Sequence, residues 1–378
     1  MSASPTAPGP RIAFAGGGTG GHIVPGLHLL ADARSRDRAP SDLVWFTSGR
    51  AVEEPALAGL AELAPGCERL VLPLEPAGGG APGLAQLARR ALPATLEARR
   101  ALKAHRSEVL LGLGGFTSLP AVLAARSLGL PCALLEVNAV AGKATRTLAR
   151  LVQRVYHAWP VSLPAASGSK HVVFGPPLDP ALARGRADAD ERRAIARAAG
   201  LPGAGPMLLV LGGSQGAGSL NRFLSDHSGA LLSAGIEVLH QCGPGRASEA
   251  PGERAGLLVR EYLSDVPELL RAADLVLCRG GASTLAEVAA ARVPAVVVPY
   301  PHHGDEHQAR NARGLGEGVR IVRDDALDAA LAQDLVQALG PAGADDRVRR
   351  SAALERAVPT DSAQRILDDL EALARRGD

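Results

Sequence analysis

The stretch that decides the fold of this chain is ADLVLCRGGASTLAEVAAARVPAVVVPYPHHGDEHQARNA, residues 273–312. Short apolar runs bounded by glycine or proline are typical of buried parallel strands, and the segments between them have helical spacing. The pattern predicts, in order, a strand over Leu275–Cys278, a glycine turn at Gly280–Gly281, a helix from Ser283, a strand over Val293–Val298, and a helix opened by Asp305 that carries Gln308 and Asn311. This alternation indicates an α/β domain with a parallel sheet.

The strand ends and helix starts of such a unit line one crevice, where ligands of open α/β sheets usually bind. Unpaired N–H groups and the helix dipole favour an anion there. Glu287, one turn into the predicted helix, can accept two hydrogen bonds from vicinal hydroxyls such as those of a ribose. A glutamate that only complements the helix dipole is the simpler interpretation. The neighbouring Gly-Gly, Ser-Thr and Asp-x-x-Gln patterns favour a ligand role.

A glycine-rich loop follows the first predicted strand in both halves of the chain. In the first half, the strand Arg11–Ala15 precedes GGGTGGH (16–22); in the second, Met207–Leu211 precedes GGSQGA (212–217). This internal similarity predicts two Rossmann-like domains. Dinucleotide binding is disfavoured, because the spacing is not G-x-G-x-x-G and no acidic residue ends the next strand, Leu43–Thr47.

Two side chains of these loops have a plausible chemical role. His22 ends the first loop, and an imidazole at neutral pH suits a general base. Its alternative role is a helix-start histidine bonded to the backbone. Ser214 in the second loop can donate its hydroxyl to a phosphate oxygen, or it can serve as a helix N-cap.

Three loops occur together and in order: GGTGGH (17–22), the second glycine loop Gly114–Ser118, and the 273–312 stretch. With them the chain resembles the two-domain UDP-sugar glycosyltransferases of the GT-B architecture, and among these the MurG type of family 28. The resemblance covers about Arg11 to Arg375. It implies an α/β fold with two Rossmann-like domains facing across a cleft, and a last helix that crosses back to the first domain.

The resemblance also implies an activity. The expected reaction is an inverting transfer of N-acetylglucosamine from UDP-N-acetylglucosamine to the C4 hydroxyl of undecaprenyl-pyrophosphoryl-N-acetylmuramyl-pentapeptide, in peptidoglycan synthesis, with no metal ion or other cofactor. It implies His22 as the catalytic base, and an acceptor entering near the first glycine loop. The residues implied for binding the UDP-sugar are Thr19, Gly20, Gly21, Asn138, Ser214, Leu263, Ala282, Ser283, Thr284, Leu285, Ala286, Glu287 and Gln308.

Within that set the resemblance assigns different parts of the donor. The backbone of Leu263 is expected at the uracil edge, Ala282 to Glu287 at uracil and ribose, and Ser214 near the phosphates. Gln308 and Asn138 are expected to hold the sugar.

Three positions depart from the family pattern. The family commonly has histidine and glutamine where Leu135 and Val137 stand, and usually has arginine near the donor diphosphate where Asp179 stands. A carboxylate repels phosphate, which leaves three possibilities. Another cation takes the place of the family's arginine, the Asp179 side chain points away from the diphosphate, or the activity is reduced.

The expected domain boundaries follow from composition and from the resemblance. Residues 1–10 are expected to be a disordered lead-in. Residues 11–175 are expected to form the acceptor- and membrane-facing domain, 176–360 the UDP-sugar domain, and 361–378 the helix that packs back. The Gly-Pro-Pro segment at 175–177 is suited to the interdomain connection.

Composition limits the class of protein. The 378 residues favour two domains, and 41 Lys+Arg against 39 Asp+Glu argue against nucleic-acid binding through overall charge. Of the four scattered cysteines, Cys132 and Cys278 lie in or beside predicted buried strands and are expected to be reduced core residues. No signal peptide or membrane span is recognisable. The sequence from Leu84 to His105 predicts two helical segments with a break near Pro93. The basic and apolar residues of these segments suit either an anionic membrane surface or a solvated helix face. A peripheral protein on the cytoplasmic face of the cell membrane is expected.

Two rival interpretations stay open. One is another enzyme of this architecture, either a glycolipid glycosyltransferase with a different acceptor or a UDP-sugar epimerase; an epimerase needs carboxylates near the sugar, and no convincing set is present. The other is a catalytically impaired relative that still binds nucleotide or lipid, which the departures at Asp179, Leu135 and Val137 suggest.

Overall fold

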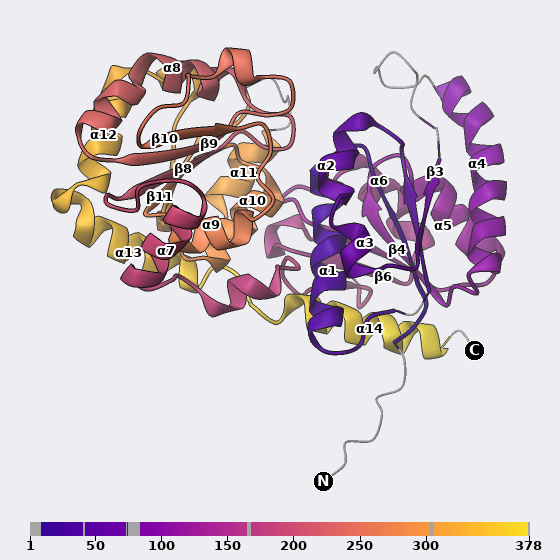
Figure 1. Cartoon of the computed structure of the whole chain (residues 1–378). Helices are drawn as coiled ribbons and strands as arrows, with labels where there is room; N and C mark the ends of the chain where they lie inside the picture. Colours follow the sequence, from indigo (N-terminus) through magenta and orange to yellow (C-terminus); the bar gives the residue numbers. More distant parts are fainter. Residues whose placement is uncertain are drawn as a thin grey trace, which may run out of the picture. The chain divides into compact units, whose positions relative to one another are not determined.

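The computed structural model of the chain describes residues 9–40, 42–72, 74, 84–164, 168–301 and 306–376, which form two compact units (Figure 1). Unit 1 comprises Met1–Pro180 and Asp361–Asp378, and unit 2 comprises Ala181–Thr360. The expected lead-in over residues 1–10 lies almost entirely outside the described residues, which begin at 9. Over the described ranges, no helix combines the length and the apolarity that crossing a bilayer requires.

Unit 1 is built on a seven-stranded parallel sheet of order β3-β2-β1-β4-β5-β6-β7. Its strands are β1 (Ile12–Gly16), β2 (Leu43–Thr47), β3 (Cys67–Val71), β4 (Val109–Gly114), β5 (Cys132–Glu136), β6 (Arg154–His157) and β7 (His171–Val173). Its α-helices are α1 (Val24–Ser35), α2 (Glu54–Leu57), α3 (Leu60–Leu63), α4 (Leu84–Ala104), α5 (Ser118–Ser127), α6 (Lys143–Leu148) and α14 (Ser362–Arg376). The central strands β1, β2 and β5 are buried along their whole length, as strands covered by helices on both faces must be.

The two faces of the first sheet bury different side chains. Ala13 and Ala15 point toward the face covered by α4 and α5, which lie side by side in Figure 1, and the small alanines allow those helices to approach closely. On the other face, Phe14 stacks on Trp45 with ring centroids 5.0 Å apart. The Trp45 indole N–H donates to the carbonyl of Gly16 over 3.0 Å, which fixes the end of β1 where the glycine loop begins.

The predicted break at Pro93 is wrong: α4 is one helix, with Pro93 inside it. A proline removes one intrahelical hydrogen bond, and the cost is lower where the freed carbonyl can bond water. Pro93 is on the exposed side of α4, whereas Ala94, Ala98 and Leu102 face the core. The helix therefore continues through the proline on its solvent side.

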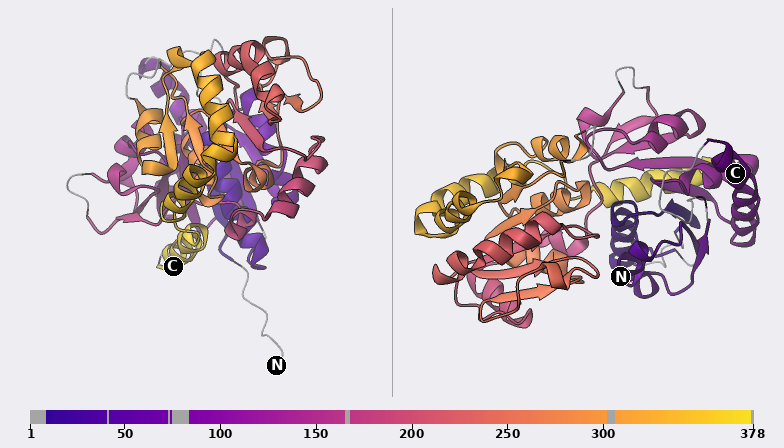
Figure 2. Two further views of the ribbon diagram at one scale, coloured as in Figure 1. Left: turned by 90° about the vertical axis from the view of Figure 1, so that its left-hand side faces the viewer. Right: turned by 90° about the horizontal axis from the view of Figure 1, so that it is seen from above.

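The last helix, α14, belongs to unit 1 although it follows all of unit 2 in sequence. In Figure 2 it is the yellow helix, and it packs beside α1. Asp369 on α14 accepts from Arg154 Nε over 2.6 Å and from the Tyr156 hydroxyl over 2.9 Å, both on β6. These bonds tie the C-terminal helix to the sheet.

Unit 2 contains a six-stranded parallel sheet of order β10-β9-β8-β11-β12-β13. Its strands are β8 (Met207–Leu211), β9 (Glu237–Gln241), β10 (Leu257–Arg260), β11 (Leu275–Cys278), β12 (Ala295–Val297) and β13 (Val319–Ile321). Its α-helices are α7 (Ala189–Ala198), α8 (Gly218–Ser233), α9 (Val266–Ala272), α10 (Ala282–Ala290), α11 (His307–Arg313), α12 (Ala329–Leu339) and α13 (Ala344–Glu355). The prediction of two Rossmann-like domains is confirmed.

Within unit 2, α8 and α12 lie together on one face of the sheet (Figure 1). Leu220, Phe223 and Leu335 are part of the core there. The predicted start of a helix at Asp305 lies outside the described residues; the helix that carries Gln308 and Asn311 is described from His307. The expectation of buried, reduced cysteines is confirmed for Cys132 and Cys278: both thiols are free and buried, and burial raises the pKa of each to about 12.

Candidate functional site

In both sheets the strand order reverses between two strands that are each followed by a glycine loop. In unit 1 these strands are β1 and β4, and in unit 2 they are β8 and β11. Ligands of open α/β sheets bind outside the carboxyl ends of the strands at such a reversal. Of the predicted site residues, Thr19 to His22 and Asn138 lie at this edge of unit 1, and the others lie in unit 2.

The two glycine loops of unit 1 lie against each other around His22. His22 ends a short 3₁₀-helix, Gly20–His22, and its Nδ1 lies 3.0 Å from the carbonyl oxygen of Gly17. A Cβ at Gly114 would lie 2.8 Å from His22 Cδ2, and one at Gly115 would lie 2.7 Å from the oxygen of Gly17. Since Nδ1 faces a carbonyl, it is the protonated nitrogen of a neutral ring, which leaves Nε2 as the basic one. His22 thus has the backbone bond of the simpler interpretation, and Nε2 is the ring nitrogen that could act as a base.

Two buried polar side chains that the sequence did not single out fix these loops. The Glu53 carboxylate is fully buried and accepts from the amides of Gly18, Ser48 and Gly49 and from the Ser48 hydroxyl. Ser118 Oγ donates to the carbonyl of Ala15 over 3.1 Å and accepts from the Gly114 amide over 3.2 Å. Glu53 therefore holds the first loop, and Ser118 joins the end of β1 to the second.

Asn138 is held by the last residue of β5. Glu136 Oε1 accepts from the backbone amide of Asn138 over 3.0 Å and from its side-chain nitrogen over 3.2 Å, while Oε2 accepts from the Thr145 hydroxyl over 2.6 Å. Leu135 and Val137, which replace polar residues of the family pattern, are buried. Apolar side chains suit those positions, because a buried polar group there would need a partner.

Asp179 lies close to a buried histidine of α1. His28 Nδ1 is 3.1 Å from the carbonyl oxygen of Pro177. Burial lowers the pKa of His28, and the Pro177 carbonyl and the Asp179 carboxylate oppose that shift. The negative charge of Asp179 thus interacts electrostatically with His28 of α1, within unit 1.

In unit 2, the loop after β8 is close-packed against the end of β9. A Cβ at Gly216 would lie 2.1 Å from the carbonyl oxygen of Cys242, so this position admits only glycine. The buried Gln241 side chain donates to the carbonyl of Gly213 over 3.1 Å and accepts from the amide of Leu263 over 3.2 Å. The amide of Leu263 is therefore already bonded, which leaves its carbonyl for a ligand.

Ser214 does not cap the following helix. The N-cap of α8 is Ala217, which offers no side-chain oxygen. The alternative role of Ser214 as an N-cap is thus wrong. No described residue shares a hydrogen bond with its hydroxyl, and Ser214 is half-exposed in the loop before the N-cap of α8.

The start of α10 presents the predicted Ala282–Glu287 segment at the same edge. The N-cap is Gly281, which has no side chain to bond the first amides of the helix. Ser283 Oγ is buried without a hydrogen-bond partner among the described residues. Glu287 is buried, and its charge contributes, after burial itself, to raising the pKa of Tyr262. Tyr262 is 41% exposed and lies beyond the end of β10, so its ring is available for stacking against a base.

The first turn of α11 packs directly on the glycine turn after β11. A Cβ at Gly280 would lie 2.4 Å from the carbonyl oxygen of Gln308. Gln308 Oε1 accepts from the amides of Gly280 over 3.1 Å and Tyr300 over 2.9 Å, and Asn311 donates to the Gly280 carbonyl over 3.1 Å. Because both partners of Oε1 are N–H groups, the amide nitrogen of Gln308 is the part left to donate to a ligand.

Arg279, a residue that sequence reasoning passed over, joins three elements. Its guanidinium is buried and donates to Asp324 over 2.6 Å, to the Ser219 hydroxyl over 2.7 Å and to the carbonyl of Val298 over 3.0 Å. It therefore braces the glycine turn against α8 and β12. Its position directly before Gly280 is the only signal of this role in the sequence.

Together, the edge of unit 2 offers two helix N-termini for a diphosphate, a buried carboxylate for hydroxyls, and an exposed aromatic ring for a base. Unit 1 offers an imidazole between two glycine loops.

Comparison with known families matches both halves of the chain. Residues 12–157 match the glycosyltransferase family 28 N-terminal domain, and residues 207–344 match the glycosyltransferase family 28 C-terminal domain.

Similar proteins were found over nearly the whole chain. A UDP-N-acetylglucosamine–N-acetylmuramyl-(pentapeptide) pyrophosphoryl-undecaprenol N-acetylglucosamine transferase from Sorangium cellulosum is 39% identical over 96% of this chain and 88% of its own length. A transferase of the same name from Rhodococcus jostii is 36% identical over 96% of this chain and 97% of its own length. Among solved structures, MurG of Acinetobacter baumannii has a TM-score of 0.68 and 25% identity, covering 97% of this chain and all of that one.

Proposed function

We propose, from the premise that this chain belongs to glycosyltransferase family 28, that it transfers N-acetylglucosamine from UDP-N-acetylglucosamine to undecaprenyl-pyrophosphoryl-N-acetylmuramyl-pentapeptide. The observation that carries the proposal is the 39% identity over 96% of the chain to a transferase of that name. A glycine loop at the strand reversal of each sheet supports it. The acceptor atom is the C4 hydroxyl of the muramyl sugar.

The donor binds at unit 2. The ribose hydroxyls bond to Glu287, the uracil edge meets the carbonyl of Leu263, and the ring of Tyr262 stacks on the base. The diphosphate lies at the N-termini of α8 and α10, where Ser214 donates its hydroxyl. The amide nitrogen of Gln308 donates to the sugar hydroxyls.

The chemistry requires that the leaving diphosphate be stabilised and that the acceptor hydroxyl lose a proton. Preorganised amides and helix dipoles at developing negative charge lower the barrier without reorganising. Nε2 of His22 accepts the acceptor proton, while the bond from Nδ1 to Gly17 keeps the ring in the tautomer that has a basic Nε2. The acceptor approaches unit 1 near Thr19 to His22, and inversion at the sugar carbon follows from a single displacement.

Peripheral contact with the cytoplasmic face of the membrane is the second part of the proposal. Leu92 and Leu96 are exposed on α4, with 66% and 47% of their surfaces accessible, and Arg100 and Lys103 continue the same helical stripe toward the C-terminus. Apolar side chains beside cations suit the headgroup region of an anionic bilayer. Sedimentation with phosphatidylglycerol vesicles tests this: Leu92→Ser with Leu96→Ser should weaken binding, and Leu123→Ser, an exposed leucine on α5, serves as control.

The test of the activity is incubation with UDP-N-acetylglucosamine and the lipid-linked muramyl acceptor, followed by mass analysis of the lipid. The expected product is heavier by one N-acetylhexosamine. Donor incubated alone distinguishes an epimerase, which would convert the sugar without acceptor. Tight UDP binding with no product would instead support a non-catalytic relative.

His22→Ala tests the assignment of the base. If His22 removes the proton, this change lowers turnover by about 10²- to 10⁴-fold and leaves UDP binding nearly unchanged. Turnover equal to that of the unchanged protein would remove His22 from the mechanism.

A further inference from the structure

Unit 2 contains a cavity of about 550 Å³ that the proposed reaction does not use. Its lining residues are Arg184, Arg186, Arg192, Asp274, Arg292, Ala344, Arg347, Val348, Ser351, Ala352 and Glu355. Asp274 directly precedes β11, and Arg292 precedes β12. The cavity therefore lies at the amino-terminal edge of the sheet, whereas the glycine loops lie at the carboxyl ends of the strands.

The charges lining this cavity are unbalanced. It is lined by five arginines and two carboxylates. Glu355 pairs with Arg292 over 2.9 Å. Asp274 is shared by Arg186 over 2.7 Å and Arg192 over 3.7 Å, and it also accepts from the amide of Met207. The carboxylates therefore leave a net positive charge on the cavity wall.

Arg347 adds to this excess. Its guanidinium donates to the carbonyls of Ala338 and Gly340. Within the described ranges it pairs with no carboxylate. Its charge is therefore compensated only by backbone dipoles at the end of α12.

Arg186 is the least satisfied of the group. Its Nε is buried and has no hydrogen-bond partner among the described residues. Burial lowers the pKa of Arg186, and the charges of Arg192 and Arg347 lower it further, against the opposing effect of Asp274. Bringing an anion into the cavity would satisfy the free N–H and relieve the repulsion among these three guanidinium groups.

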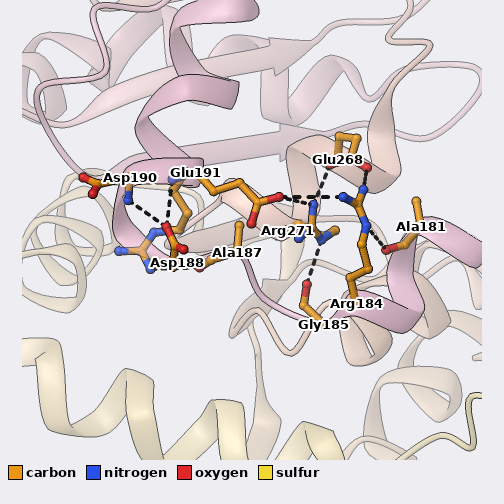
Figure 3. A network of polar contacts seen from close by, with 10 residues as sticks. Ala181, Arg184, Gly185, Ala187, Asp188, Asp190, Glu191, Glu268 and Arg271 are labelled. Carbon is orange, nitrogen blue, oxygen red and sulfur yellow. Dashed lines mark hydrogen bonds and ion pairs between the residues drawn. The ribbon is translucent and has the colours of Figure 1, made fainter.

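A neighbouring buried arginine, Arg271, has its positive charge balanced by carboxylates. Arg271 is 3% exposed, and its guanidinium meets two carboxylates, Glu268 over 2.7 Å and Glu191 over 2.9 Å, and the carbonyl of Gly185 (Figure 3). Glu268 also pairs with Arg184 at the rim of the cavity. Arg271 and Arg184 thus share two carboxylates, whereas Arg186 and Arg192 share the single carboxylate of Asp274.

We propose that this cavity is a binding site for a phosphate or diphosphate group of a second ligand, separate from the donor site. Guanidinium groups bind phosphate oxygens through paired, charge-assisted hydrogen bonds, and Arg186, Arg192 and Arg347 all line this cavity. A volume of about 550 Å³ also accommodates the organic part of a small phosphorylated molecule.

Titration calorimetry of the full chain with inorganic pyrophosphate tests the proposal. Arg347→Gln and Arg192→Gln should each weaken binding by about tenfold or more, since each removes a charged donor. Arg349→Gln is the matched control: it lies on α13 two residues from Arg347, removes the same charge, is 63% exposed at the side chain and does not line the cavity. Ser214→Ala controls for pyrophosphate held at the donor site. Thermal melting without ligand shows which variants are folded. One folded cavity variant, either Arg347→Gln or Arg192→Gln, is sufficient for the test.

Weaker binding in the cavity variants, with Arg349→Gln unchanged, supports the site, and a separate loss of binding in Ser214→Ala reports pyrophosphate held at the donor site. No measurable pyrophosphate binding, equal weakening by Arg349→Gln, or binding that only Ser214→Ala weakens would overturn it. Competition by phosphatidylglycerol vesicles, but not by phosphatidylcholine vesicles, would identify the phosphate source as a lipid headgroup; competition by neither would exclude this headgroup.

Discussion

Replacing Gly115 by alanine tests whether the two glycine loops of unit 1 position His22. Gly115 has φ +77°, and an added Cβ would lie 2.7 Å from the carbonyl oxygen of Gly17 and 3.3 Å from His22 Nδ1. Ordinary contact begins at 3.4 Å, so the Gly17 carbonyl, which bonds His22 over 3.0 Å, must move by about 0.7 Å. The methyl group therefore acts on the atom that orients the imidazole.

The matched control is Gly129→Ala. Gly129 has the same φ of +77°, and nothing lies within 4 Å of its added Cβ. Both substitutions therefore cost the same left-handed strain, about 1–2 kcal/mol. Only Gly115→Ala adds overpacking, which costs about 1–3 kcal/mol more.

The expected result is a difference in both stability and turnover. In melting experiments Gly115→Ala should unfold several degrees below Gly129→Ala, at about 2–4 °C per kcal/mol. Its turnover with donor and lipid acceptor should fall by about 10- to 100-fold, because displacements approaching 1 Å have that effect on aligned groups. Equal melting temperatures and equal turnover in the two variants would refute the proposed role of this contact.

Three further outcomes are expected. Glu53→Gln places an amide N–H₂ against a backbone N–H, so the free energy of unfolding of unit 1 by denaturant should fall by about 1–3 kcal/mol. The control Glu54→Gln, at a side chain that is 60% exposed, should lower that free energy little, and equal losses would contradict the role of the buried carboxylate. Ser214→Ala should leave the melting temperature unchanged and lower transfer, since its hydroxyl has no partner among the described residues; a lowered melting temperature would indicate a structural role. Burial lowers the pKa of His240 from 6.5 to about 4, so the unfolded chain binds more protons between these values and stability falls as pH falls through this window. The loss is about 2 kcal/mol at pH 5, and His240→Gln should flatten the pH dependence of unfolding measured by circular dichroism.

The sequence alone was informative about elements that depend on neighbours along the chain. The strands expected over Leu43–Thr47, Met207–Leu211 and Leu275–Cys278 have the same bounds in the structure. The other predicted strand ends agree with the structure to within two residues, because each strand is a short apolar run bounded by glycine or proline. The errors fell at strand ends: the strand expected over Val293–Val298 is only Ala295–Val297, and the strand expected over Arg11–Ala15 is Ile12–Gly16.

What the sequence by itself determined is therefore the pair of Rossmann-like sheets and their glycine loops, since period, turn residues and their order are local properties. The tertiary structure decided how the loops are held. Glu53 bonds Gly18 across 35 residues of sequence, Gln241 joins Gly213 to Leu263, and Arg186, Arg192 and Arg347 meet in one cavity. Such contacts depend on the register of parallel strands and their crossovers, and each buried polar group is satisfied, or left for a ligand, only by what the folded chain brings to it.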